Sequence, residues 1–129
     1  MPRYVGWQGV GTGAGVSLTT TTETVVASLS GVQTDNIYRR ILLSGVVEVN
    51  PGTGATSLTL RIRRDSVSGT AIGTAVTVAC TASTKLSATI AATDEPGEVA
   101  GQTYVLTAQQ GGATGNGTCD VALLSALSY

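Results

Sequence analysis

Short runs of alternating apolar and polar residues, each ended by a turn signal, are the feature that most constrains this chain. In the clearest run, 57–63, Leu58, Leu60 and Ile62 alternate with polar or charged residues. A period of two is typical of a strand with one face in a core and the other in solvent. Turn signals recur at intervals of about 8–12 residues, and no run has the 3.6-residue apolar period of a helix. The pattern therefore predicts an all-β protein.

The runs predict an antiparallel β-sandwich or jelly roll of seven to eight strands. An open β-prism or a partial barrel would give a similar pattern. The run 38–49 is almost continuously apolar around Gly45, which predicts a strand buried on both faces with a bulge or bend at the glycine. Strands are expected at 23–29, 38–49, 57–63, 74–80, 85–91, 102–109 and 118–129.

The first 22 residues have a different composition. Glycines and small residues fill 9–15, and four threonines follow at 19–22. Gly9, Gly11 and Ala14 match the spacing of a phosphate-binding loop, but that loop requires a helix after it, and the threonines are poor helix formers. We therefore predict an extended N-terminal arm over residues 1–22 and one sandwich domain over 23–129.

Composition excludes several classes of function. The chain has 129 residues, no His, two Cys, seven basic and eight acidic residues. A net charge of -1 offers no field to attract nucleic acid or an anionic membrane. Without His there is no Ser-His or Cys-His triad, and two Cys are too few for a structural zinc site. We expect Cys80 and Cys119 to be small buried thiols, and we expect no enzyme activity, metal or cofactor.

An acidic turn supplies the only clustered carboxylates. Asp94, Glu95 and Glu98 lie within five residues around Pro96-Gly97. Such carboxylates could bind calcium or act as the acid pair of a glycosidase. Neighbouring acids on a Pro-Gly turn are more often solvated, and this is what we expect here.

A core without Phe and with one Trp buries less area than usual, which favours association with other subunits. Tyr, Trp and Arg are enriched at such contacts. Arg61 and Arg63 share the outward face of one strand, although ion pairs within the chain, to Glu48, Asp65 or the acidic turn, are an alternative. The predicted partner contacts are Tyr4, Trp7, Tyr38, Arg39, Arg40, Arg61 and Arg63.

The order of segments supplies a resemblance. The strand 23–29, the long strand 38–49, the segment 58–65 with its Ser-Gly-Thr hairpin, and the strand 103–108 before a small-residue loop resemble small jelly-roll proteins of tailed-bacteriophage virions, similar to tumour-necrosis-factor and C1q-like domains. Some of these are head decoration (cement) proteins and others are tail-fibre or baseplate domains. The resemblance covers 23–129 and implies a homotrimer without catalytic residues, often with an N-terminal arm over neighbouring capsid subunits.

Together these observations predict a non-enzymatic virion structural protein. We expect it to be assembled in the host cytoplasm and to bind the exterior of the capsid as a homotrimer, with the major capsid protein or another virion subunit as partner. We expect it to bind neither nucleic acid nor membrane. The alternative is a tail-fibre, baseplate or surface module that binds glycans through Tyr and Trp. An enzyme that uses the acidic turn is the third and weakest hypothesis.

Overall fold

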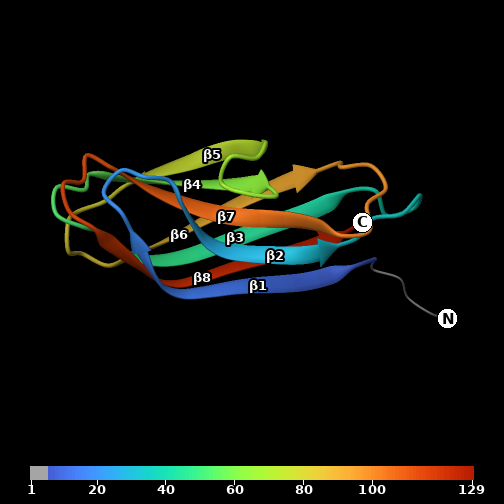
Figure 1. Cartoon of the computed structure of the whole chain (residues 1–129), viewed down its shortest axis with the longest axis horizontal. Helices are drawn as coiled ribbons and strands as arrows, with labels where there is room; N and C mark the ends of the chain where they lie inside the picture. The colour runs from blue at the N-terminus through green and yellow to red at the C-terminus, as the bar shows by residue number, and fades with distance from the viewer. Residues whose placement is uncertain (1–5) are drawn as a thin grey trace.

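Two four-stranded antiparallel sheets pack face to face in the computed structural model, which describes residues 6–129 (Figure 1). The strand order is β1-β8-β3-β6 in the first sheet and β2-β7-β4-β5 in the second. The strands are β1 (Gln8–Leu18), β2 (Thr24–Val32), β3 (Ile41–Asn50), β4 (Ser57–Arg64), β5 (Ala71–Ala79), β6 (Leu86–Asp94), β7 (Gln102–Gly111) and β8 (Gly117–Ser128). The described residues contain no helix, and the predicted all-β sandwich is confirmed. Eight strands in two sheets with these crossovers form a jelly roll.

The core consists almost entirely of aliphatic side chains from the inner faces of both sheets. Leu58, Leu60 and Ile62 of β4 are completely buried, as the alternation predicts. Tyr104 is the largest fully buried side chain, and Trp7 packs against the edge of the core. Cys119 is buried and Cys80 is half-buried, and both are free thiols.

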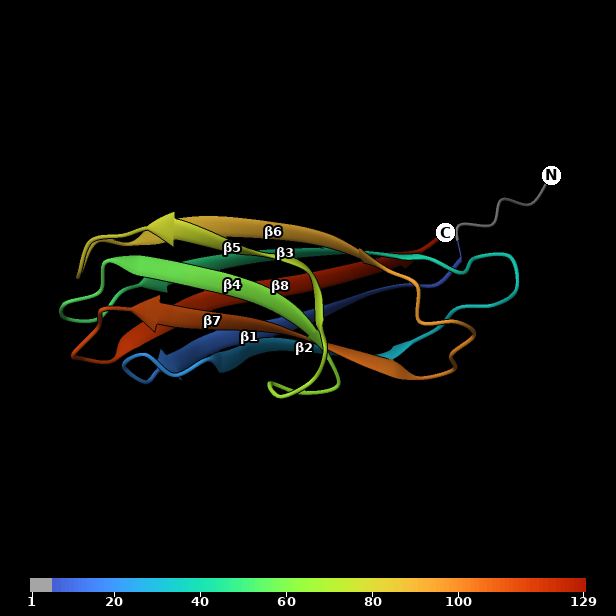
Figure 2. The ribbon, with the colours of Figure 1, turned by 90° about the horizontal axis from the view of Figure 1, so that it is seen from above.

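The structure differs from the predicted arm over residues 1–22. Residues 8–18 form β1, which pairs with β8 from Gln8↔Leu127 to Leu18↔Gly117. The glycines permit this, because Gly11 and Gly13 lie against the backbone of β2. A Cβ on Gly13 would lie 1.8 Å from the Val26 carbonyl oxygen. Figure 2 shows β1 beside β2 at one border of the sandwich and β5 beside β6 at the other. Residues 1–5 of the predicted arm lie outside the described residues.

The prediction for the long apolar run is wrong in two respects. β3 is buried on one face only, since Leu43 and Val47 are buried while Leu42 and Val46 are exposed. The register with β6 and β8 is also unbroken at Gly45, so there is no bulge at the glycine, and the one register shift of β3 lies at Glu48/Val49 opposite β8. Gly45 faces the core, where a Cβ would lie 2.9 Å from a Leu106 methyl carbon. The run is continuously apolar because its outward residues are apolar as well.

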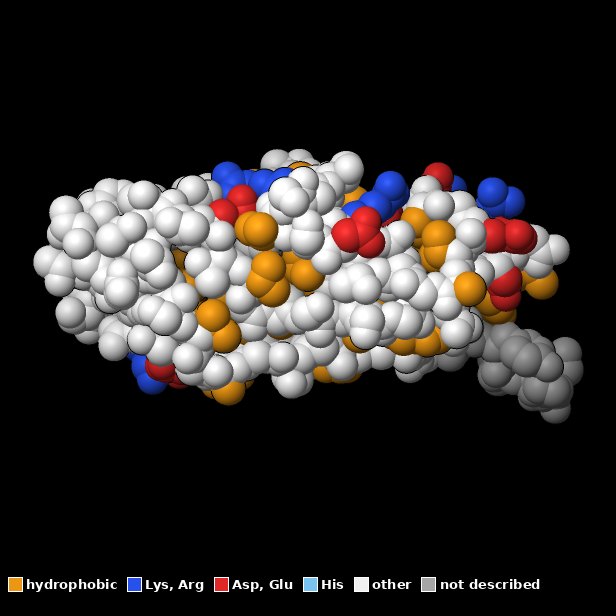
Figure 3. Space-filling model, in the orientation of Figure 1, with side chains coloured by type: hydrophobic (Ala, Val, Ile, Leu, Met, Phe, Trp, Pro, Cys, Tyr) orange, Lys and Arg blue, Asp and Glu red, His pale blue; other side chains and the backbone are white. Residues whose placement is uncertain are grey.

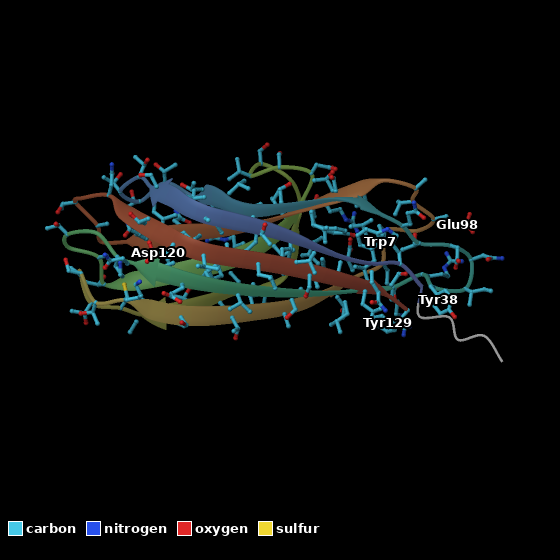
Figure 4. The ribbon with its side chains drawn as sticks, turned by 90° about the horizontal axis from the view of Figure 1, so that it is seen from below. Trp7, Tyr38, Glu98, Asp120 and Tyr129 are labelled. Carbon is cyan, nitrogen blue, oxygen red and sulfur yellow. The ribbon has the colours of Figure 1, made fainter. Side chains whose placement is uncertain are left out.

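Both ends of the described chain meet at one end of the sandwich (Figure 4). The Trp7 backbone N–H donates to the Ser128 hydroxyl at 2.6 Å, and the Ser128 N–H donates to the Trp7 carbonyl at 2.8 Å. Arg40 and Tyr129 exchange two backbone hydrogen bonds beside them. We refer to residues 6–7, 35–40, 95–98 and 128–129 as the terminal end.

Candidate interaction surfaces

Arg61 and Arg63, two predicted contact residues, point outward from β4 into a network on the second sheet. Arg63 binds Glu23 with two hydrogen bonds, of 2.7 Å from Nε and 2.9 Å from an Nη. Arg61 donates to Gln109 at 2.6 Å and approaches Glu23 at 3.5 Å. The Thr107 hydroxyl also donates to Glu23 at 2.6 Å. Both arginines are thus engaged within the chain, which favours the ion-pair alternative.

The acidic partner in this network is not one that the sequence suggested. The sequence offered Glu48, Asp65 and the acidic turn as partners for the arginines. Arg61 and Arg63 pair instead with Glu23, just before β2. Arg40 and Arg64 do pair with the acidic turn, through Glu95 and Asp94. β7 lies between β2 and β4 in the sheet, and its side chains Thr107 and Gln109 complete the network. This partnership depends on the order of strands, which local sequence does not specify.

The Glu23 network predicts a pH dependence. The hydrogen bond from Arg63 outweighs partial burial and lowers the pKa of Glu23. A carboxyl group with a lowered pKa in the folded state stabilises the fold above its unfolded pKa, and this contribution is lost as pH falls through the folded pKa. We expect Glu23→Gln to cost about 2 kcal/mol of unfolding free energy at pH 7 and to cost much less at pH 2–3. Urea denaturation at both pH values measures this, with Glu98→Gln at an exposed position as the control. An equal cost at both pH values would contradict it.

The prediction that the acidic turn is solvated is wrong for Asp94. This residue ends β6 in the first sheet, is 7% exposed, and accepts hydrogen bonds from Arg64 Nε at 2.8 Å and an Arg64 Nη at 2.5 Å. The Tyr104 hydroxyl donates to it at 2.5 Å, and the Glu95 N–H donates at 2.9 Å. Since Arg64 and Tyr104 belong to the second sheet, we refer to this group as the inter-sheet ion pair.

The electrostatics of this pair suit a structural role. Burial alone would raise the pKa of Asp94, but the hydrogen bonds from Arg64 and Tyr104 and the charge of Arg64 lower it overall. Burial and the same carboxylate raise the pKa of Tyr104. Every partner of Asp94 is supplied by the protein itself. Within residues 6–129, no three His, Cys, Asp or Glu side chains gather as a metal site would require.

The terminal end holds most of the other predicted contact residues. Figure 4 shows Trp7, Tyr38 and Tyr129 at this end, so three of the five aromatic residues that are scattered in the sequence come together. Arg40 Nε donates to Glu95 at 2.6 Å, and Arg39 is exposed. Tyr4 lies outside the described residues. Ile37, which we did not predict as a contact, is 72% exposed here.

The outer side of the first sheet has a different chemistry. Its central part contains no charged residue. We refer to this side as the uncharged face, made of Gln8, Val10, Thr12 and Ala14 of β1, Val121, Leu123, Ser125 and Leu127 of β8, Leu42, Ser44 and Val46 of β3, and Ser87, Thr89, Ala91 and Thr93 of β6. Five of these are large exposed hydrophobic residues, namely Val10, Leu42, Val46, Val121 and Leu123.

Among residues 6–129, the charged side chains on this side of the molecule lie at its two ends. Lys85 pairs with Glu48 at 3.2 Å and with Asp120 at 3.0 Å at one end, and Arg40 pairs with Glu95 at the other. Figure 3 shows charged side chains gathered along the upper border, over the second sheet, whereas the lower border has one charged group at its left end. The two outer faces of the sandwich are therefore chemically unlike.

A shallow groove of about 360 Å³ crosses half of the uncharged face. It lies where two serines, Ser44 and Ser125, face each other across β3 and β8. Its walls are Gln8, Val10, Leu42 and Leu127. A mostly apolar groove whose polar side chains are two serines and one glutamine, without a charged group, suits packing against another surface better than binding a polar small molecule.

Comparison with known proteins identifies the fold but no sequence family. No protein-family model matches the chain, and no curated protein matches it. The structure of infectious bursal disease virus, Gx strain, aligns over 95% of this chain at 13% identity and a TM-score of 0.57. The VP2 subviral particle of the same virus aligns over 94% of this chain at 10% identity and a TM-score of 0.52. This chain spans only about a third of those capsid-protein chains, 32% and 33%.

These similarities show a jelly-roll fold of the kind found in viral capsid proteins. A family 6 carbohydrate-binding module aligns over 85% of this chain and 72% of its own, at 14% identity and a TM-score of 0.45, which is too low to carry an argument. The part of the chain that the structure describes contains no helix able to span a membrane.

Proposed function

We propose that this chain is a non-enzymatic structural protein of a virus particle, which decorates and stabilises the outside of the shell. The observation that carries this proposal is the uncharged face, an outer sheet surface with five large exposed hydrophobic residues and no charge in its centre among the described residues. Large exposed apolar patches on soluble proteins mark interaction sites. The fold shared with capsid proteins supports the same conclusion.

Two surfaces would serve assembly of the particle. The uncharged face offers apolar area for contact with another protein subunit, and the terminal end offers Trp7, Tyr38 and Arg39 beside both ends of the described chain. Aromatic and Arg side chains are the groups that most often dominate binding energy at interfaces. We propose that the terminal end contacts the shell, the major capsid protein being the expected partner. A homotrimer, assembly in the host cytoplasm and a bacteriophage origin remain predictions from the resemblance.

Co-sedimentation with virus particles tests this function. Capsids of the virus that encodes the chain, prepared without this protein, should bind the purified protein in a fixed and saturable ratio. Combined Tyr38→Ala and Arg39→Ala substitutions should weaken binding about 10-fold or more, because they remove a half-buried aromatic side chain and an exposed guanidinium of the kinds that dominate interfaces. Thr84→Ala, an exposed change in the turn that precedes Lys85, should bind as the unmodified protein does.

Two results would contradict the proposal. Absence of binding to capsids at any protein concentration would remove the virion role. If the protein instead binds a glycan on an array in a saturable way, and Trp7→Ala abolishes that binding, the terminal end belongs to a recognition module. The gathering of three aromatic side chains at this end is the observation that favours that second candidate.

A further inference from the structure

We propose that two copies of this chain pack against each other through their uncharged faces, about a two-fold axis. The axis would run across the strands, parallel to the first sheet, and would reverse the strand direction of the second copy. This inference does not rest on the proposed function, because it concerns the contact between copies and not the shell. The surface relief, the charge distribution and the area of the uncharged face all support it.

The relief of the uncharged face is self-complementary. Outward residues form rows across the sheet, and adjacent rows lie about 6.8 Å apart. One row contains the paired Ser44 and Ser125, which make the groove. The next contains the paired Val46 and Leu123, which are 42% and 37% exposed. On β3 and β8, in the middle of the sheet, two small side chains thus lie directly beside two large ones, whereas Val10 at the β1 end of the serine row is large and 57% exposed.

A two-fold axis between these rows would place the large pair on β3 and β8 over the small pair of the other copy. Val46 of one copy would sit over Ser44 of the partner subunit, and Leu123 over Ser125 of the partner subunit. Because the operation is symmetric, both pairs of contacts occur twice. Sheets packed face to face interdigitate their side chains in the same way within a sandwich.

The distribution of charge fits the same axis. The ion pairs Lys85–Glu48 and Arg40–Glu95 lie at opposite ends of the face. Reversing one copy leaves the uncharged centre against the uncharged centre. It places Glu48, which is paired with Lys85 of its own chain, near Leu42 of the partner subunit at the rim of the contact. In this arrangement every charge near the contact keeps its partner. Burying an unpaired charge would cost several kcal/mol of binding free energy, on the order of 3–5 kcal/mol. The outer face of the second sheet could not pack this way, because its centre holds Arg61, Arg63 and Glu23.

The area is sufficient for a specific contact. The uncharged face spans four rows of outward residues, from Gln8 to Ala14 in β1, which at about 6.8 Å per row gives a length of roughly 27 Å. Four strands about 4.8 Å apart give a width of roughly 19 Å. The face therefore covers about 500 Å² per copy before side-chain relief is counted, and the roughly 1,000 Å² of the pair reaches the lower bound for a specific interface.

Sedimentation velocity on the full chain tests the contact. We expect the mass of two 12.9 kDa chains at micromolar concentration. Leu123→Lys should raise the dimer dissociation constant at least about 100-fold, because it buries two unpaired charges per dimer. Ser28→Lys, the same new side chain at an exposed position on β2 of the second sheet, is the matched control and should leave the dimer intact.

An exchange of side chains tests the register. Ser44→Val and Val46→Ser should each weaken the dimer about 10-fold, because one fills the groove and the other removes the ridge. The double variant has the composition of the original chain and again places large over small, so it should restore most of the affinity. Equal unfolding midpoints for all four proteins would show that the fold is unchanged.

Three results would overturn this inference. The first is a single-chain mass at the highest soluble concentration. The second is an oligomer whose mass Leu123→Lys does not change, which would include a trimer built through another surface. The third is a double variant, Ser44→Val with Val46→Ser, whose loss of dimer affinity equals the sum of the two single losses. A monomer whose binding to capsids is lost in Leu123→Lys would assign the uncharged face to the shell instead. Failure of capsid binding with an intact dimer would reject the proposed function alone.

Discussion

Asp94→Asn should reduce the free energy of unfolding by about 3 kcal/mol or more. The substitution leaves the Arg64 guanidinium without its charged partner and the Tyr104 hydroxyl with a weaker acceptor. Removing one member of a buried ion pair costs about 3–5 kcal/mol, and we take the lower value because Arg64 is one-third exposed. Urea denaturation at neutral pH, followed by Trp7 fluorescence, measures the change.

The matched control is Asp120→Asn. Asp120 pairs with Lys85, but the two side chains are 32% and 54% exposed. An exposed pair contributes about 0–1 kcal/mol, so this variant should unfold almost as the original chain does. If the two Asn variants lose equal stability, Asp94 is not the link between the sheets that its contacts indicate.

Gly13→Ala should destabilise the fold by about 3 kcal/mol, although it adds only one methyl group. The new Cβ would lie 1.8 Å from the Val26 carbonyl oxygen, which is backbone and has no rotamer to change. Overpacking typically costs about 1–3 kcal/mol, and a clash with backbone belongs at the upper end. The expected cause is separation of β1 from β2.

Gly101→Ala is the control for this substitution. A Cβ on Gly101 meets nothing within 4 Å, and its φ is not in the left-handed region. Restricting the unfolded chain at such a position stabilises a protein by about 0.4–1 kcal/mol. The same Gly→Ala change should therefore lower the free energy of unfolding at position 13 and raise it at position 101. A neutral Gly13→Ala would mean that β1 can move away from β2 at little cost.

Alternation predicted the strands whose outward residues are polar. In β4, apolar side chains point only toward the core, so local pattern and tertiary environment agree. In β1 they disagree. Its glycines allow the backbone of β1 to approach the backbone of β2 closely, but in the sequence a run of glycines is equally typical of a flexible segment. A contact between two backbones involves no apolar side chains, so no alternation in the sequence predicts it.

The candidate surfaces were predictable to different extents. The outward direction of Arg61 and Arg63 followed from the period of two, but Glu23 and Asp94 became partners only through the order of strands in each sheet. The sequence does contain an indication of the uncharged face. Leu42 and Val46 have the opposite parity to the core residues of the same strand. We predicted burial on both faces from this run, because sequence does not distinguish a surface covered by the same chain from one left open.

The position of β8 between β1 and β3 has a consequence for synthesis on the ribosome. Among the eight strands, β8 is translated after the others and is the second strand of its sheet. β1 is translated before the other seven and has no other neighbour in that sheet. Contacts between such distant segments form slowly. Nascent chains should therefore keep β1, and the edge of β3 that pairs with β8, unprotected until β8 has left the exit tunnel. Premature termination within β8 should give aggregates instead of a smaller native protein.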